Sequence, residues 1–165
     1  IFSSSLHDLT KVSKLAKSTI VCSLARANKV DIERANEALS FAKRFRIHTF
    51  IATSELHMKY KLQMTREKVI QQIKDSVSYA RNFTDDVEWS AEDGSRSDFD
   101  FLCKCIDVAI KSGAKTINIP DTVGYCMPLE YQDIFKKIRN NVDNIEDITL
   151  SVHCHNDLGL SLIHI

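Results

Sequence analysis

Short β-branched, apolar runs alternate with longer amphipathic segments along most of the chain, and this alternation constrains the fold more than any other feature. The expected strands are residues 19–24, 46–52, 86–90, 115–119 and 148–153. The expected helices are about residues 6–17, 31–44, 65–82, 97–111 and 129–140. Because one helix lies between each pair of strands, at about 30 residues per repeat, the pattern predicts a parallel sheet with right-handed crossovers.

Local signals support several of these element boundaries. Asp31, Thr65 and Ser97 are the expected helix N-caps, and Asp100 follows Ser97 at the spacing of a capping box. Gly113 is the expected stop of its helix. We also expect Ile1 and Phe2 to be the tail of an earlier strand.

Polar side chains come at or near the end of one strand after another, whereas no glycine-rich phosphate loop follows any strand. This distribution is typical of the mouth of a barrel rather than of a doubly wound sheet. We therefore expect an α/β fold in the form of a partial (β/α)8 TIM barrel, with parallel strands roughly two to seven and inward-facing Val, Ile and Leu side chains. The polar residues concerned are His48, Ser90, Glu92, Asp121, Thr122, His153 and His155.

His153 and His155 form the most specific local motif. Residues i and i+2 of a strand point to one face, so the two imidazoles converge while Cys154 faces the opposite way. This is the geometry of a metal-ligand pair, although satisfied structural or surface imidazoles are an open alternative. Two histidines also make an incomplete site, because a catalytic metal needs at least one further carboxylate or amide ligand.

Composition excludes some partners. Lys+Arg and Asp+Glu are equal at 22 each, which gives no electrostatic footprint for nucleic acid or an anionic membrane, so we expect small-molecule partners. The apolar runs are short, and neither a spanning helix nor a signal peptide is visible, which predicts a cytoplasmic protein. Five cysteines without paired spacing indicate reduced thiols, and Cys103 and Cys105 are interpreted as structural.

Four segments near the strand ends carry a family resemblance. They are RIHTFIATS at 46–54 with HMKYKL at 57–62, VEWSAED at 87–93, TINIPDTVG at 116–124 and SVHCHNDLG at 151–159. Together they resemble the 2-isopropylmalate synthase family, which lies among barrel metalloenzymes that include homocitrate synthase, citramalate synthase and hydroxymethylglutaryl-CoA lyase. The resemblance covers nearly the whole chain.

The resemblance implies condensation of acetyl-CoA with 2-oxoisovalerate, followed by thioester hydrolysis to 2-isopropylmalate. Such chemistry needs a base for the methyl proton and a Lewis acid for the keto carbonyl. By resemblance, His153 and His155 bind a divalent metal, with Mn²⁺ as the first choice and Zn²⁺ or Mg²⁺ as alternatives. Glu92 matches a catalytic position, and the family's keto-acid pocket positions are matched by His48, Ser90 and Thr122. His57 receives no role.

Each of these residues also has a structural interpretation. Glu92 would then be a loop carboxylate that caps a helix, His48 a buried imidazole bonded to backbone, and Thr122 a turn or N-cap residue. Asp121 after Pro120 would be turn chemistry.

Several family features are not found in the sequence, which predicts that residues 1–165 form an incomplete catalytic domain. The family's Arg-Asp-Gly segment on the first strand, its Asn after the last strand and its C-terminal regulatory domain are missing. Residues 161–165 depart from the family pattern, and His164 is not expected to be a ligand. We expect this chain to be inactive by itself and its full-length form to be a homodimer or larger homo-oligomer. Homocitrate synthase, citramalate synthase and a non-catalytic remnant are the alternatives.

Overall fold

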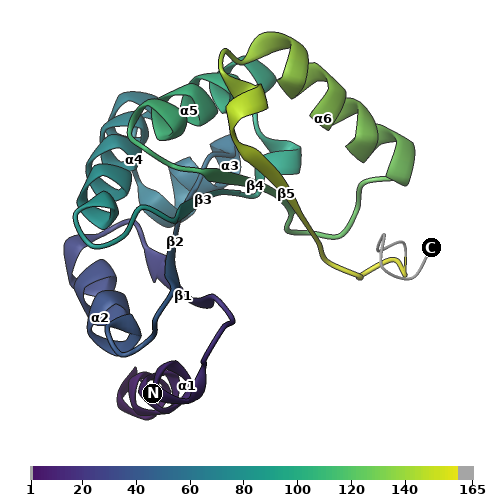
Figure 1. Ribbon diagram of the computed structural model, residues 1–165. Coiled ribbons are helices and arrows are strands. Elements are labelled where there is room, and N and C mark those ends of the chain that lie inside the picture. The colour runs from purple at the N-terminus through teal and green to yellow at the C-terminus, as the bar shows by residue number, and fades with distance from the viewer. Residues whose placement is uncertain (1, 160–165) are drawn as a thin grey trace.

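The structure is a computed structural model that describes residues 2–159, with only the backbone described for residues 2–5. Its strands form one parallel sheet in the order β1-β2-β3-β4-β5. Figure 1 shows this sheet as an arc with the helices on its convex side, as in a segment of a barrel. The predicted α/β fold and partial barrel are therefore confirmed. The strands are β1 Val21–Arg26, β2 Phe45–Ala52, β3 Val87–Glu92, β4 Thr116–Asp121 and β5 Thr149–Cys154.

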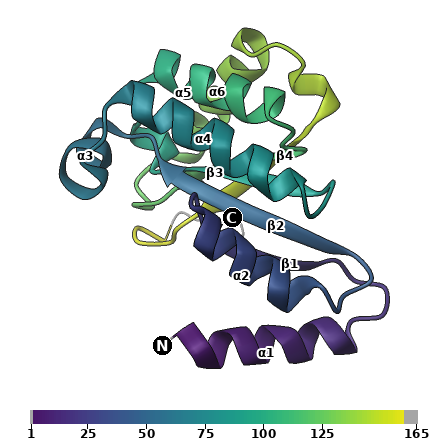
Figure 2. The same cartoon turned by 90° about the vertical axis from the view of Figure 1, so that its left-hand side faces the viewer.

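Helices connect consecutive strands, and every predicted strand boundary lies within two residues of its observed place. Three short turns were not predicted: a π-helical turn after α3, and two 3-10 turns before α5 and β5. Figure 2 shows α1 lying beside α2. The helices are α1 Phe2–Leu15, α2 Lys29–Leu39, α3 Glu55–His57, α4 Arg66–Arg81, α5 Phe99–Lys111 and α6 Pro128–Asn141, and the turns are η1 Met58–Leu62, η2 Gly94–Arg96 and η3 Ile145–Asp147.

The helix caps agree with the sequence at only one of three positions. Thr65 caps α4 by accepting a hydrogen bond from the Lys68 backbone, as predicted. Asp31 is not the cap of α2, because Asn28 accepts the hydrogen bond from the Asp31 backbone and starts the helix earlier. Ser97 is not the cap of α5 either, because Asp98 takes that role.

The ends of the chain also bear on the predictions. Phe2 is helical rather than part of a strand, because α1 begins there. Ile1 and the tail with His164 lie outside the described residues. Across residues 2–159, we find no helix with the length and apolar character needed to span a bilayer.

The apolar core lies between the sheet and the helices, so the expected inward orientation of Val and Ile side chains is wrong. Ile47, Val87 and Ile117 are fully buried in one cluster with helix residues such as Ile73 and Ile106. Since strand side chains alternate, the residues between them project to the concave face. Those residues are mainly polar, and they include Arg46, His48, Glu88, Ser90, Asn118 and Ser151.

Candidate active site

Polar side chains on the concave face form a continuous chain of hydrogen bonds across four strands. His48 Nε2 lies 2.5 Å from Ser90 Oγ, which donates to Asn118 Oδ1 at 3.0 Å. Asn118 Nδ2 donates to Ser151 Oγ at 3.0 Å. Because the Ser90 hydrogen goes to Asn118, the consistent assignment has His48 donating through Nε2–H, with Nδ1 left as an acceptor.

The same face carries an ion-pair network next to His48, formed by Arg46 with Asp86 and Glu88. Arg46 donates from Nη1 to Glu88 Oε2 at 2.9 Å and from Nε to Asp86 Oδ1 at 2.8 Å. Burial lowers the pKa of His48 most, and the charges of Arg46 and His153 add to this lowering while Glu88 opposes it. The His48 imidazole is therefore neutral at physiological pH and suited to hydrogen bonding. It lies within β2 and not at its end, which corrects the strand-end placement.

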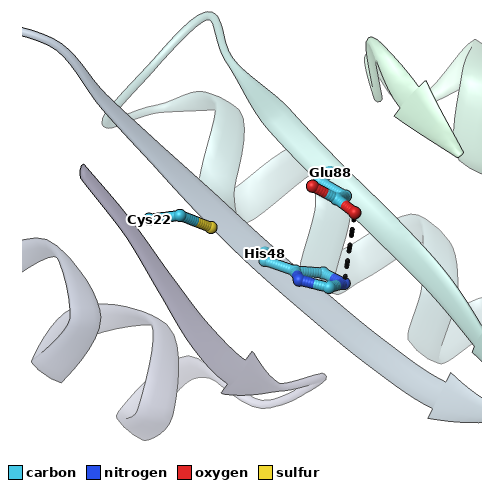
Figure 3. A group of neighbouring side chains, drawn as sticks. All are labelled: Cys22, His48 and Glu88. Atoms are coloured by element: carbon cyan, nitrogen blue, oxygen red, sulfur yellow. Dashed lines mark ion pairs between the residues drawn. The ribbon is translucent and has the colours of Figure 1, made fainter. Parts of the chain in front are cut away.

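Cys22, His48 and Glu88 approach one another closely on the concave face, as Figure 3 shows. One potential ligand atom from each lies within 4.8 Å of the others, so these residues could hold a metal ion. Two observations argue against a metal ion bound by these three residues. Glu88 is already paired with Arg46. Although Cys22 is exposed overall, loss of water around its sulfur and the charge of Glu88 raise the pKa of the thiol to about 11. Without a metal, the thiol is protonated at neutral pH.

Glu92 is the last residue of β3, and its carboxylate caps no helix among the described residues. Its Oε1 lies 2.5 Å from Lys61 Nζ and 3.9 Å from His57 Nδ1. The capping interpretation of this residue is therefore wrong. Because strand side chains alternate between the two faces, His48 on β2 and Ser90 and Glu92 on β3 all project to the concave face. Within residues 2–159, however, no hydrogen bond or ion pair joins Glu92 to His48 or Ser90.

Thr122 and Asp121 lie where β4 ends and the chain turns toward α6. Thr122 Oγ1 accepts a hydrogen bond from the Asp93 backbone at 2.9 Å, which ties the ends of β3 and β4 together. The Asp121 carboxylate is buried and accepts from Ser95 Oγ and from the Cys126 backbone, both at 2.9 Å. Asp121 therefore organises the turn, as its structural interpretation predicts.

His153 and His155 are exposed at the end of β5, and their rings stack with centroids 5.0 Å apart and an interplanar angle of 20°. The two imidazoles thus share one side, as two ligands of one ion require. Among the described residues, no His, Cys, Asp or Glu completes a three-ligand group with them. The pair by itself could supply two ligands of a divalent ion, and its role as a metal site stays a prediction.

The residues that hold these side chains in place were not predicted. Lys61, Glu88, Asn118 and Ser151 were given no role, yet each contacts a candidate residue or links two of them. The signal for the strand residues was the polar character of alternate positions in β2 to β5. No comparable signal marks Lys61, because its contact depends on the π-helical turn.

Sequence comparisons show which known proteins this chain is similar to. A family model described as HMGL-like matches residues 2–163. The chain is 55% identical over 154 residues to "2-isopropylmalate synthase" of Bradyrhizobium sp. (strain ORS 278) and 57% identical over 152 residues to that of Rhodopseudomonas palustris (strain BisB18). These alignments cover 93% and 92% of this chain but only 29% of each relative.

Solved structures show the same fold at low sequence identity. Hydroxymethylglutaryl-CoA lyase from Pseudomonas aeruginosa superposes with a TM-score of 0.76 at 17% identity, covering 98% of this chain and 53% of that one. The HMG-CoA lyase from Brucella melitensis gives a TM-score of 0.75 at 17% identity, covering 98% of this chain and 56% of that one. At this identity, the likeness concerns the fold alone.

Proposed function

The chain belongs to the HMGL-like family, and from that premise we propose that it forms part of the catalytic barrel of a 2-isopropylmalate synthase. The reaction is condensation of acetyl-CoA with 2-oxoisovalerate and hydrolysis of the thioester, an acyl transfer that belongs to leucine biosynthesis. The observation that carries the proposal is one concave face with the His48–Ser90 hydrogen bond, the Glu92 carboxylate and the paired imidazoles of His153 and His155. The two relatives with that name reported above are 55% and 57% identical over 93% and 92% of this chain.

His153 and His155 would hold a divalent metal, with Mn²⁺ as the first choice and Zn²⁺ or Mg²⁺ as alternatives. When bound, that ion supplies Lewis-acid polarisation of the keto carbonyl. Imidazoles with exposed rings are suitable ligands, and the stacking of the two rings keeps them on one side. The remaining ligands come from outside the described residues or from substrate.

Glu92 handles a proton or binds the developing hydroxyl, because it is a strand-end carboxylate on the concave face. His48 and Ser90 line the keto-acid pocket, and their mutual hydrogen bond fixes both polar groups before substrate arrives. Thr122 anchors the β3 and β4 ends and contributes its hydroxyl to the same pocket. The full-length protein acts as a cytoplasmic homodimer or larger homo-oligomer.

A chimera tests this proposal directly. Residues 2–163 replace the matching stretch of the Bradyrhizobium relative, and release of free thiol from acetyl-CoA is measured with 2-oxoisovalerate, 2-oxoglutarate and pyruvate. We expect turnover with 2-oxoisovalerate to exceed turnover with the other two acids by at least about tenfold. The unmodified relative is the positive control.

The other outcomes separate the alternatives. Preference for 2-oxoglutarate would indicate a homocitrate synthase, and preference for pyruvate a citramalate synthase. A folded chimera without turnover on any of the three acids would favour a non-catalytic remnant.

A further inference from the structure

Two cationic or ionisable side chains meet the Glu92 carboxylate from the segment that follows β2. Lys61 Nζ lies 2.5 Å from Glu92 Oε1, and the Glu92 side chain is only 18% exposed. His57 Nδ1 lies 3.9 Å from the same oxygen. Within residues 2–159, the hydrogen bond from Lys61 goes to Oε1 and none goes to Oε2, so one oxygen is held and the other is open to a further hydrogen bond.

The His57 imidazole has an unusual environment. Its Nδ1 is buried without a hydrogen-bond partner among the described residues, and it lies 3.7 Å from Asp93 Oδ2. Asp93 is fully buried and held by Arg96, which donates from Nε and Nη2 at 2.8 Å each. Leaving a buried ring nitrogen without a hydrogen bond costs free energy. Hydrogen bonds of catalytic groups are often long in the free enzyme and shorten when substrate binds.

The segment that presents these two residues is itself anchored. His57 and Lys61 are four residues apart, so they share one side of the helical turn formed by α3 and η1. Ser54 Oγ accepts from the His57 backbone, and Met58 is buried in the core. The π-helical turn ends at Gln63, which has a left-handed φ of 53°. Turns of this kind occur frequently at functional sites.

We propose that Lys61 and His57 are positioning residues that hold Glu92 Oε1 and thereby aim Oε2 at the substrate. The inference rests on the proposed role of Glu92 in catalysis. Lys61 supplies a charged donor that keeps the carboxylate in one rotamer. His57 Nδ1, 3.9 Å from the same oxygen and without a hydrogen-bond partner among the described residues, becomes a second donor when the site tightens around substrate. Neither residue touches the reacting atoms. Their loss therefore lowers turnover more than substrate affinity.

A labelling experiment tests the contact without relying on activity. Acetic anhydride modifies free lysine amines, and mass spectrometry follows Lys61 and Lys59 in the chimera with and without Glu92→Gln. Lys59 is the matched control because it lies in the same turn, with its ammonium over the Tyr60 ring. We expect Glu92→Gln to speed modification of Lys61 about three- to fivefold and to leave Lys59 unchanged. An unchanged rate at Lys61 would overturn the proposal.

A kinetic experiment tests the positioning role. Lys61→Met should lower kcat by about tenfold while KM for 2-oxoisovalerate stays within about twofold, and Lys61→Arg should recover most of the loss. Lys59→Met should retain normal turnover. His57→Asn, which keeps a nitrogen donor, should retain more activity than His57→Leu. Normal kcat in Lys61→Met, or equal losses in Lys61→Met and Lys59→Met, would overturn the proposal.

The two proposals fail separately. A chimera that is inactive before any substitution refutes the proposed function, whereas the labelling rates still decide whether Lys61 holds Glu92.

Discussion

β3 and β5 belong to one sheet, but they position their functional side chains by different means. The first five residues of β3 are buried, whereas no residue of β5 is buried. Ser90 is fixed by hydrogen bonds to both neighbouring strands, while His153 and His155 are exposed and stack on each other. Side chains on β3 are therefore placed by folding itself, whereas the exposed imidazoles of His153, within β5, and His155, just after it, are less constrained by packing.

The largest expected effect comes from removing either imidazole at the end of β5. In the chimera, His153→Ala or His155→Ala should lower turnover by at least about a thousandfold, because each removes one proposed ligand of the Lewis-acid metal. The metal-free free energy of unfolding should change by less than about 0.5 kcal/mol, since both rings are exposed. Mass spectrometry of bound metal after dialysis and urea unfolding measure the two effects.

His7→Ala is the control for this prediction, because His7 is an exposed histidine on α1. It should change neither turnover nor metal content. Unchanged metal affinity in both the His153 and His155 variants would remove the pair from the site.

A core substitution on β3 should give the largest stability difference between the two strands. Trp89 is fully buried, whereas Val152 on β5 is 54% exposed. Trp89→Ala should lower the free energy of unfolding by about 3–5 kcal/mol, and Val152→Ala by less than about 1 kcal/mol. Urea unfolding of the chimera measures both.

Trp89→Phe refines this stability prediction. Trp89 Nε1 is buried without a hydrogen-bond partner among the described residues, so the Phe variant removes an unsatisfied donor together with part of the ring. We expect it to lose much less stability than Trp89→Ala. Equal losses in the Ala variants of Trp89 and Val152 would show that burial does not distinguish the two strands.

Most of the fold could be predicted from the sequence, because the helical and strand periods are strong and alternate regularly. The strand boundaries were recovered even for the exposed strand β5. The cap of α5 was misplaced because Ser97 and Asp98 are adjacent and both are good caps, so only the backbone conformation decides between them. The polar concave face was missed because the pattern of one strand does not reveal which side the helices cover.

The site could be predicted only in part. Resemblance selected His48 and Ser90 independently, and the structure brings them into contact at 2.5 Å. The Lys61 contact to Glu92 could not be foreseen, because it joins residues from different βα units through a π-helical turn. Assignment of the metal to His153 and His155 stays a prediction.

A substitution of Glu92 at the end of β3 tests whether its carboxylate acts in catalysis or only in the structure. Glu92→Gln in the chimera should lower turnover by about a hundredfold while the melting temperature changes little, because the amide keeps the shape but cannot take a proton. Steady-state thiol release and thermal melting measure the two effects. Glu37→Gln, on the exposed side of α2, is the control. Normal turnover with a lowered melting temperature would instead support a purely structural Glu92.

The smallest expected effect concerns the influence of a charge on the central strand β3 on a thiol of the edge strand β1. Loss of water around the sulfur and the charge of Glu88 raise the pKa of the Cys22 thiol to about 11. Thiolate is the reactive form, so iodoacetamide should modify Cys22 in the native chain at pH 8 about a hundredfold more slowly than in the urea-unfolded chain. Glu88→Gln should raise the native rate about two- to fivefold, because it removes a negative charge and leaves the lowering effect of Arg46.

The reason this effect should be small is that desolvation is the largest cause of the raised Cys22 pKa and does not depend on Glu88. Cys103 is the internal control, since burial and Asp100 raise its pKa, and it lies on α5. Its rate of modification should not respond to Glu88→Gln, and mass spectrometry resolves the two thiols in one sample. An unchanged Cys22 rate would mean that β3 exerts no electrostatic influence on β1. A rate in Glu88→Gln equal to that of the unfolded chain would mean that charge, and not loss of water, dominates at this edge of the sheet.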